Sequence, residues 1–185
     1  SFLPALALLA TLGGCSQESE TEAELLARAK AIHDRVITLD THKDISSDLA
    51  SEEAPSDPSE RERFLQRNDP TLEGPNQVDF PKMRAGGLDV AFFIVYVGQG
   101  PLTGADYANA HAQAIAKFDA VHRLTEEIAP DRIELALTSD DVRRIAATGK
   151  KVAMIGIENA YQVGLDLNNI RDFAERGGRY MSLAH

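Results

Sequence analysis

Apolar residues gather in four short runs that are separated by segments with helical spacing. The runs are rich in β-branched and aromatic residues, and each is too short or too continuous for a surface helix, so they predict strands buried on both faces. Strands that alternate with helices predict βαβ units and a parallel sheet. The predicted strands are Val36–Leu39, Leu88–Val97, Val152–Ile157 and Tyr180–Leu183.

The helical segments have apolar residues every three or four positions and polar residues suited to capping near their starts. Thr21 with Glu24 three residues later has the form of a capping box. The other predicted helices follow Asp106 as a candidate cap, Thr138–Ser139 with an end at Gly149, and Asp166 with an end at Gly177–Gly178.

The segment 46–77 interrupts this alternation with four prolines, many charges and little periodicity. Because it is too long for a passive connection, we expect a loop or short-helix excursion directly after the first strand. Two interpretations remain open: the excursion helps to shape a site, or it is a disordered insertion without a role.

The N-terminal residues 2–12 are almost wholly apolar and lead through Gly13 and Gly14 to Cys15. The run is too short to span a membrane, which takes about 20 residues, and it resembles a bacterial lipoprotein signal with a lipidated cysteine. The alternative is an ordinary secretory segment or a buried helix with an incidental thiol. We therefore expect a signal peptide over 1–15, a tether over 16–22 and a domain over 23–185, held in the bacterial cell envelope on its extracytoplasmic side.

Composition narrows the class of protein further. A chain with 43% hydrophobic and 26% charged residues is suited to one globular core. Its net charge of -10 is repelled by nucleic acid and by anionic membrane surfaces, so no nucleic-acid partner is expected and the lipid anchor is the only predicted membrane contact. The single cysteine excludes an intramolecular disulfide.

Side chains with catalytic or metal-binding chemistry follow three of the predicted strands: the run Asp40–Asp44, then Glu158, then His185. The carboxyl ends of parallel strands share one face, so these side chains are expected to meet there. His42 and Asp44 stand two apart, which in an extended chain directs both to one side, although an ordinary polar loop also contains such triplets. Nitrogen and carboxylate ligands suit zinc, with manganese, iron and cobalt left open.

Glu158 follows the apolar run Ile155–Ile157, and an ionised carboxylate in such surroundings needs a compensating charge. A cation supplies that charge, and a carboxylate can also bridge two cations; the alternative is a strand-end carboxylate that caps a turn. His185 follows the fourth predicted strand, and on that position alone we expect it to be a metal ligand as well. His111 and His122 lie on a predicted helix, where a structural or solvated role is expected.

Four blocks of the sequence resemble the membrane (renal-type) dipeptidase family, in order and over about residues 23–185. They are Asp40–Asp44, Gln77–Gly87 leading into Phe92–Val97, Gly156–Tyr161 and Gly178–His185. The resemblance implies an α/β fold, namely the N-terminal half of a (β/α)₈ TIM barrel of the metal-dependent, amidohydrolase-type hydrolases. It also implies a centre with two zinc ions in the full-length protein.

By position, the resemblance implies that His42 and Asp44 bind the first zinc and that Glu158 bridges both ions. It makes His185 a substrate contact that steadies the tetrahedral intermediate, not a metal ligand. Lys43 stands where the family often has a neutral residue. The implied reaction is hydrolysis of a dipeptide by a zinc-activated water, in bacterial relatives often with a D-residue at the C-terminal position.

The resemblance places the second-zinc histidines, the arginine for the substrate carboxylate and the acid that assists the leaving amine on later strands, beyond residue 185. Residues 1–185 alone are therefore expected to be inactive and poorly soluble. Two other functions remain open: an amidohydrolase-type enzyme that acts on a lactam, ester or cyclic amide, and a peptide-binding envelope lipoprotein without catalysis. The preferred dipeptide, the metal and a homodimeric state are also left open.

Overall fold

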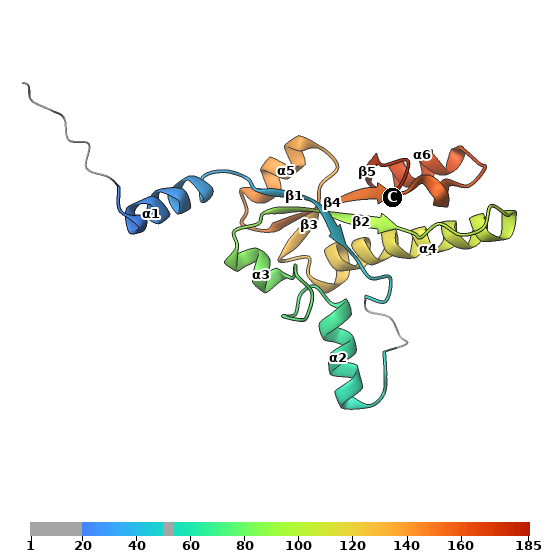
Figure 1. Ribbon diagram of the computed structural model, residues 1–185, viewed down its shortest axis with the longest axis horizontal. Coiled ribbons are helices and arrows are strands. Elements are labelled where there is room, and N and C mark those ends of the chain that lie inside the picture. Colours follow the sequence, from blue (N-terminus) through green and yellow to red (C-terminus); the bar gives the residue numbers. More distant parts are fainter. Residues whose placement is uncertain (1–19, 50–53) are drawn as a thin grey trace, which may run out of the picture.

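A parallel sheet forms the centre of the molecule in the computed structural model, which describes residues 20–49 and 54–185 (Figure 1). The strands run in the order β1-β2-β4, and β3 and β5 pair with the start and the end of the same far edge of β4. The strands are β1 (Leu39–Asp44), β2 (Val90–Tyr96), β3 (Ile133–Leu135), β4 (Lys151–Glu158) and β5 (Gly178–Met181). The predicted signal peptide with Cys15 and tether residues 16–19 lie outside the described residues.

Helices and helical turns occupy the connections between the strands. No helix in the described parts of the chain is long and apolar enough to cross a membrane. The helices are α1 (Glu22–His33), α2 (Pro58–Asn68), α3 (Phe80–Ala85), α4 (Gly104–Arg123), α5 (Ser139–Ala146) and α6 (Asn168–Glu175), with a π-helical turn η1 (Leu124–Ile128) and a 3₁₀ turn η2 (Ala160–Val163).

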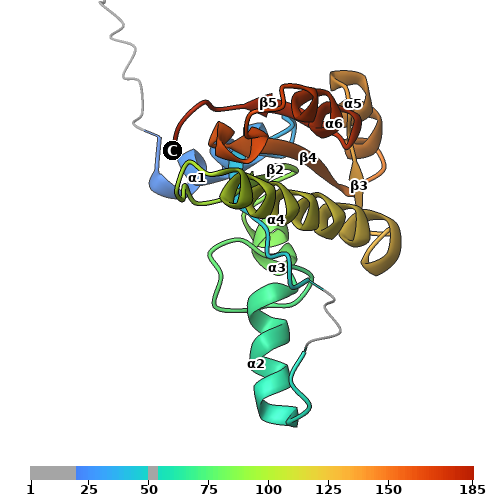
Figure 2. The ribbon, with the colours of Figure 1, turned by 90° about the vertical axis from the view of Figure 1, so that its right-hand side faces the viewer.

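Strands β2 and β4 are the buried centre of the sheet, as their continuous apolar runs predict. They pair in parallel from Val90 opposite Val152 to Tyr96 opposite Glu158. One face packs on α4, which lies along the sheet in Figure 2, and there Phe118 of α4 meets Phe173 of α6 with ring centroids 5.4 Å apart. The packed core holds β2 and β4 in register, so that their carboxyl ends, Tyr96 and Glu158, lie side by side.

Strand β1 begins where the sequence predicts its end. The predicted strand Val36–Leu39 shares only Leu39 with the observed one, and both Val36 and Ile37 are about half exposed. The observed strand pairs with β2 from Leu39 opposite Val90 to Asp44 opposite Ile94. Because one face of β1 carries polar side chains, it lacks the apolar run that marks β2 and β4, and the expectation of burial on both faces is wrong for it. The same holds for β5, two of whose residues are exposed.

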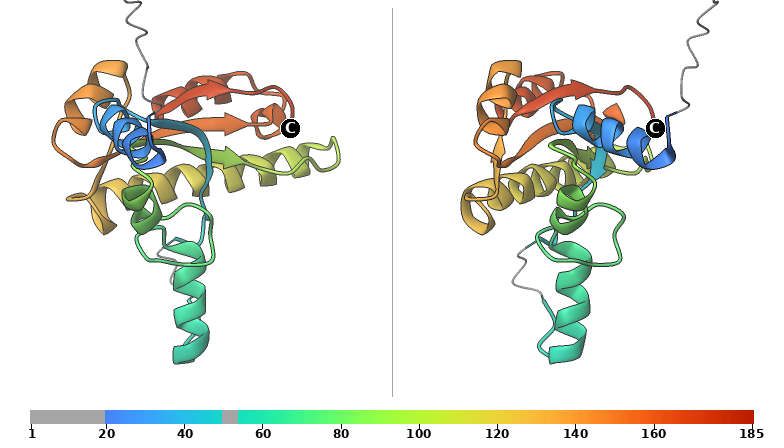
Figure 3. Two further views of the ribbon diagram at one scale, coloured as in Figure 1. Left: turned by 60° about the vertical axis from the view of Figure 1, so that its left-hand side comes forward. Right: turned by 90° about the vertical axis from the view of Figure 1, so that its left-hand side faces the viewer.

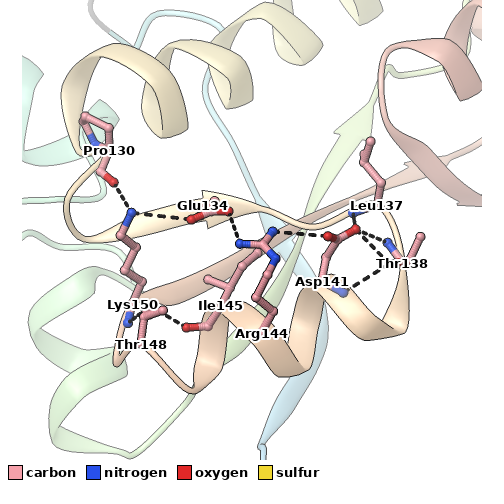
Figure 4. Close-up of polar contacts among 9 residues, drawn as sticks. All are labelled: Pro130, Glu134, Leu137, Thr138, Asp141, Arg144, Ile145, Thr148 and Lys150. Carbon is pink, nitrogen blue, oxygen red and sulfur yellow. Dashed lines mark hydrogen bonds and ion pairs between the residues drawn. The ribbon is translucent and has the colours of Figure 1, made fainter.

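Strand β3, which the sequence patterns did not predict, forms a unit with the predicted helix α5. Figure 4 shows how side chains hold it together: Arg144 pairs with Glu134 at 2.7 Å and with Asp141 at 3.2 Å. Lys150 donates to the carbonyl of Pro130 at 2.8 Å, and Ile145 packs among buried residues at the start of β2 and β4. The unit therefore closes one end of the sheet, opposite the end where the strands finish.

The excursion after the first strand contains helix α2, which projects away from the sheet as an arm in Figures 1 and 3. Asp57 caps this helix by accepting hydrogen bonds from the backbone N–H groups of Ser59 and Glu60, both at 3.0 Å. Pro58 at the first helical position needs no hydrogen-bond partner for its nitrogen. The predicted short-helix excursion is thus confirmed for its described residues.

Helix caps follow the predictions at two of the four positions. Thr21 and Glu24 form the predicted capping box of α1, and Thr138 caps α5 in the same manner with Asp141. Helix α4 is capped by Thr103 and not by Asp106, which lies in its first turn and accepts a hydrogen bond from the Thr103 hydroxyl. The N-cap residue of α6 is Leu167 and not Asp166, although the Asp166 carboxylate accepts a hydrogen bond from the Asn168 N–H at 2.9 Å.

Candidate metal centre and active site

Three segments far apart in the sequence bring an imidazole, a carboxylate and a second imidazole together at one edge of the sheet. His42 Nε2 lies 3.3 Å from Glu158 Oε2, and His185 Nε2 lies 3.6 Å from Glu158 Oε1. His42 comes from β1, Glu158 ends β4, and His185 follows β5 by four residues. The prediction that strand ends deliver these groups to one face is confirmed.

His42 and Asp44 lie within strand β1, so their side chains alternate with that of Lys43. Asp44 Oδ1 lies 4.0 Å from His42 Nε2. Lys43 is buried, its Nζ donates to the carbonyl of Asp44 at 3.2 Å, and it lies 5.2 Å from the centroid of the Phe93 ring, which belongs to the core. Burial lowers the pKa of the Lys43 ammonium, an effect that Asp44, Asp79 and Asp40 oppose. The ammonium therefore points away from His42.

Glu158 is the least exposed member of the cluster, with 18% of its side chain accessible against 50% for His42 and 67% for His185. The next residue, Asn159, has φ of 70°, a left-handed conformation that asparagine tolerates better than most residues. Its buried side-chain amide donates through Nδ2 to the carbonyl of Val97 at 3.1 Å and accepts through Oδ1 from the Tyr161 N–H at 3.2 Å. This turn fixes the end of β4, from which the Glu158 side chain projects.

The donor atoms fit a zinc-type cation in chemistry and in part in geometry. Two ligands that each lie about 2.0–2.2 Å from a tetrahedral zinc are roughly 3.3–3.6 Å apart, and the His42–Glu158 separation of 3.3 Å matches. Asp44 is farther away and its side chain is 76% exposed. Accordingly, no group of three or more His, Cys, Asp or Glu side chains within residues 20–49 and 54–185 is arranged to hold a metal ion as it stands. Of the three side chains predicted as ligands, His42 and Glu158 are in contact and Asp44 lies 4.0 Å from His42.

A tyrosine that the sequence patterns did not single out lies across the site face. The Tyr180 hydroxyl donates to the carbonyl of Thr41 at 2.7 Å, which links β5 to β1, and its ring lies 5.1 Å from that of Phe92. The ring passes over Gly156, where an added Cβ would come within 2.4 Å of it. Burial raises the pKa of the Tyr180 phenol, and Glu158 and Asp40 add to the effect. The site face is therefore curved, with the two outer strands bridged by one side chain.

Two further residues near the cluster were missed by sequence reasoning. Tyr96, opposite Glu158 in the pairing of β2 with β4, stacks at a tilt against His185 with ring centroids 4.9 Å apart. Lys117 of α4 places its Nζ 5.9 Å from the Tyr96 centroid. Burial lowers the pKa of Lys117, while the carboxylates of Asp44 and Glu158 oppose that shift. Tyr96 stands in the block Phe92–Val97 but was assigned no role there, and Lys117 stands in none of the blocks, so the three-dimensional pairing shows their places.

The remaining histidines lie away from the cluster, as predicted for His111 and His122. His111 stacks on Phe173 with centroids 5.4 Å apart, and His122 bonds Glu126 at 2.9 Å through Nδ1. His33 is exposed on α1 and contacts the carbonyl of Gly86 at 3.1 Å. All three hold helices in place.

Comparison with known proteins decides the family. The profile described as "Membrane dipeptidase (Peptidase family M19)" matches residues 26–185, which is most of the chain. The chain belongs to this membrane dipeptidase family. The match covers β1 to β5 and all members of the cluster, so the family resemblance of the sequence blocks is confirmed.

Individual relatives agree with this membership. Dipeptidase tcpJ of Claviceps purpurea is 31% identical over 123 residues, covering 64% of this chain and 29% of its own. The probable dipeptidase PvdM from Pseudomonas aeruginosa has the same fold, with a TM-score of 0.72 and 21% identity over 89% of this chain and 38% of its own. A metallopeptidase from Rhodobacter sphaeroides, liganded with a phosphinate mimic of the dipeptide L-Ala-D-Ala, is 26% identical with a TM-score of 0.51 over 65% of this chain and 42% of its own.

The coverage places this chain within a larger architecture. The chain spans 29% to 42% of the lengths of these membrane dipeptidases and structural relatives. Strands β1, β2, β4 and β5 are consecutive neighbours in the sheet, which is half of what an eight-stranded barrel contains. The predicted fold class, the N-terminal half of a TIM barrel of the amidohydrolase type, is thereby confirmed.

Proposed function

We propose that this chain forms the N-terminal, site-bearing half of a metal-dependent dipeptidase. The observation that carries the proposal is the convergence of His42, Glu158 and His185 at the carboxyl edge of the sheet, with contacts of 3.3 and 3.6 Å, in a member of the membrane dipeptidase family. In TIM barrels that edge holds the active site. The dipeptide mimic bound to the Rhodobacter sphaeroides relative supports a dipeptide as substrate.

The proposed cofactor is zinc, with two ions expected in the full-length protein. His42, Asp44 and Glu158 would hold the first ion, and the second carboxylate oxygen of Glu158 leaves it able to bridge to another. When bound, zinc supplies Lewis-acid chemistry: it polarises a carbonyl and makes water more acidic. The remaining ligands would come from outside the residues that make up this half of the barrel.

The chain's own residues would then act on the substrate directly. Glu158 can orient the attacking water and accept its proton, since the turn at Asn159 fixes the end of the strand from which the carboxylate projects. His185 can donate a hydrogen bond to the oxyanion that develops on the peptide carbonyl. The ring of Tyr96 packs against His185 and restricts where that imidazole can point.

The test is the variant Glu158→Gln, which keeps the shape of the side chain and removes its charge. The protein encoded by the complete reading frame that contains residues 1–185 is purified with zinc and assayed on Ala-Ala with either an L- or a D-residue at the C-terminus. We expect kcat/KM to fall by about 10²- to 10⁴-fold and bound zinc to fall in parallel, measured by elemental analysis. The matched control is Glu127→Gln, because Glu127 is exposed on η1, away from the cluster.

The same assay separates the proposal from its rivals. Cleavage of lactams, esters or cyclic amides in preference to dipeptides would indicate another amidohydrolase-type enzyme. Peptide binding without hydrolysis by the wild-type protein loaded with zinc would indicate a binding lipoprotein and overturn the proposal.

We also propose that the protein is anchored in the bacterial envelope through a lipid on Cys15. The support is the apolar run that ends in Gly13, Gly14 and Cys15. Membrane fractionation tests it: the wild-type protein should sediment with membranes, and Cys15→Ser should release it. An equal distribution of both proteins would contradict the anchor.

A further inference from the structure

A hollow of about 420 Å³ opens beside His42 and Asp44, the proposed metal ligands. His42 and Asp44 line one side of it, and the end of the arm helix α2 lines the other. Apart from Val78, the residues that the arm and the loop after it contribute are polar or charged: Arg67, Asn68, Asn76 and Gln77. A molecule bound at the cluster and extending into this hollow would reach the arm.

The arm end is held against the body of the protein by hydrogen bonds. The Asn76 side chain donates to the carbonyl of Arg67 at 2.6 Å, and Lys82 Nζ donates to the carbonyls of Gly74 and Asn76 at 2.7 and 2.8 Å. Gly74 approaches α2 so closely that an added Cβ would lie 2.0 Å from the carbonyl oxygen of Gln66. The backbone of Arg67 is therefore fixed relative to α3, and its side chain projects from a built support.

Arg67 is the positively charged residue that the arm contributes to the lining of the hollow. The hydrogen bond from Asn76 uses its backbone carbonyl, and within residues 20–49 and 54–185 no ion pair or hydrogen bond engages its guanidinium. Its neighbour Arg63, one turn earlier, is bonded to the carbonyl of Ser59 at 3.1 Å. In a chain with a net charge of -10, a guanidinium on a fixed backbone beside a polar hollow favours an anionic ligand.

We propose that Arg67 is a specificity-determining residue that binds the side-chain carboxylate of an acidic dipeptide. The guanidinium presents a planar fork of donors that matches a carboxylate, and Asn68, Asn76 and Gln77 add amide groups around it. This inference rests on the proposed dipeptidase function and names its substrate class: dipeptides that contain Asp or Glu. The excursion 46–77 would then have a role, as the element that carries the selecting charge to the site.

The experiment compares acidic dipeptides with their neutral isosteres on the zinc-loaded protein from the complete reading frame. The probe pairs are Glu-Ala with Gln-Ala and Ala-Glu with Ala-Gln, the last residue in either configuration. We expect kcat/KM to favour the acidic member of at least one pair by about tenfold or more, as for a charge-assisted hydrogen bond. Arg67→Gln should abolish this preference and leave cleavage of the neutral member within about threefold.

A matched control and a salt series separate recognition from a structural effect. Arg61→Gln removes a charge from the same helix at a position that lines a different hollow, with Pro58 and Leu65, and it should keep the preference. Because Arg67 is exposed, added salt should reduce the preference in the wild-type protein. Arg67→Lys should retain part of it, since the charge remains and the fork is lost.

The outcomes are distinguishable from failure of the proposed function. If neutral dipeptides are cleaved but acidic ones have no advantage, or if Arg67→Gln keeps the advantage, the inference is wrong and the dipeptidase proposal stands. If Arg67→Gln slows every dipeptide equally, Arg67 binds the main-chain carboxylate and this assignment is overturned. If no dipeptide is cleaved by the wild-type protein, the proposed function itself fails.

Discussion

Gly156 shows how much of this site depends on a side chain that is absent. The ring of Tyr180 occupies the space above Gly156, and its hydroxyl reaches Thr41 on the far strand. A residue with a Cβ at this position would displace the ring. The hydrogen bond to Thr41 and the packing against Phe92 would be lost together.

Gly156→Ala is therefore expected to lower the free energy of unfolding by about 1–3 kcal/mol, as for an overpacked interior. Urea denaturation of the protein from the complete reading frame measures the change. Gly104→Ala is the control, because no atom lies within 4 Å of a Cβ at that position and alanine suits the start of α4. Equal stability of the two variants would show that the Tyr180 ring yields at no cost.

Elements differ in how far the sequence could predict them, and burial explains the difference. Strands β2 and β4 are buried on both faces, so their apolar runs are continuous and were predicted. Strand β1 carries His42 and Asp44 on its exposed face, and β3 has three residues, so neither has a run of apolar residues. Strand β4 was predicted although it ends at the functional residue Glu158, so burial on both faces decides how well a strand is predicted.

The site divides in the same way. His42, Glu158 and His185 could be predicted because each stands at or near a strand end, where parallel sheets gather their functional groups. Tyr96 and Tyr180 could not, since their places depend on which strand lies beside which and on the lack of a side chain at Gly156. The role of His185 came from the family resemblance, because position alone counted it as a ligand.

Helix α5 allows a test of how much an N-terminal cap stabilises the protein. The sequence predicted its start at Thr138, which forms a capping box with Asp141. The Thr138 hydroxyl accepts from the Asp141 N–H at 3.1 Å, and hydrogen bonds from Thr138 and Arg144 hold the pKa of Asp141 below its usual range. Thr138→Ala should lower the free energy of unfolding by about 1 kcal/mol. Ser139→Ala, at an exposed neighbouring position, should change it by less than about 0.5 kcal/mol. Urea midpoints of both variants measure the difference, and an equal loss would contradict the role of the cap.

At the scale of the whole molecule, two kinds of surface favour association: unpaired strand edges and an exposed apolar helix face. The outer edges of β1 and β5 have no paired strand within the described residues, and unpaired edges favour association. Helix α1 has no buried residue, and its apolar stripe is largely exposed, including Leu26 at 62% and Ile32 at 47%. In a closed barrel both strand edges would be paired.

Residues 1–185 produced alone are therefore expected to associate or precipitate and to lack dipeptidase activity. Sedimentation velocity and the Ala-Ala assay with zinc measure the two properties. A soluble monomer that cleaves dipeptides at rates like a full-length relative would show that the site is complete without the second half of the barrel.

The bridge from Tyr180 to Thr41 has a consequence for how such a barrel is built. The Tyr180 side chain joins β1 and β5, the first and last of these four barrel strands. The sheet is therefore curved in this half before a barrel closes. A pre-bent half can serve as a template for its complement. We expect that the two halves, made as separate chains and refolded together, would reconstitute one barrel. The chain could then be divided after β5 to give a two-part reporter.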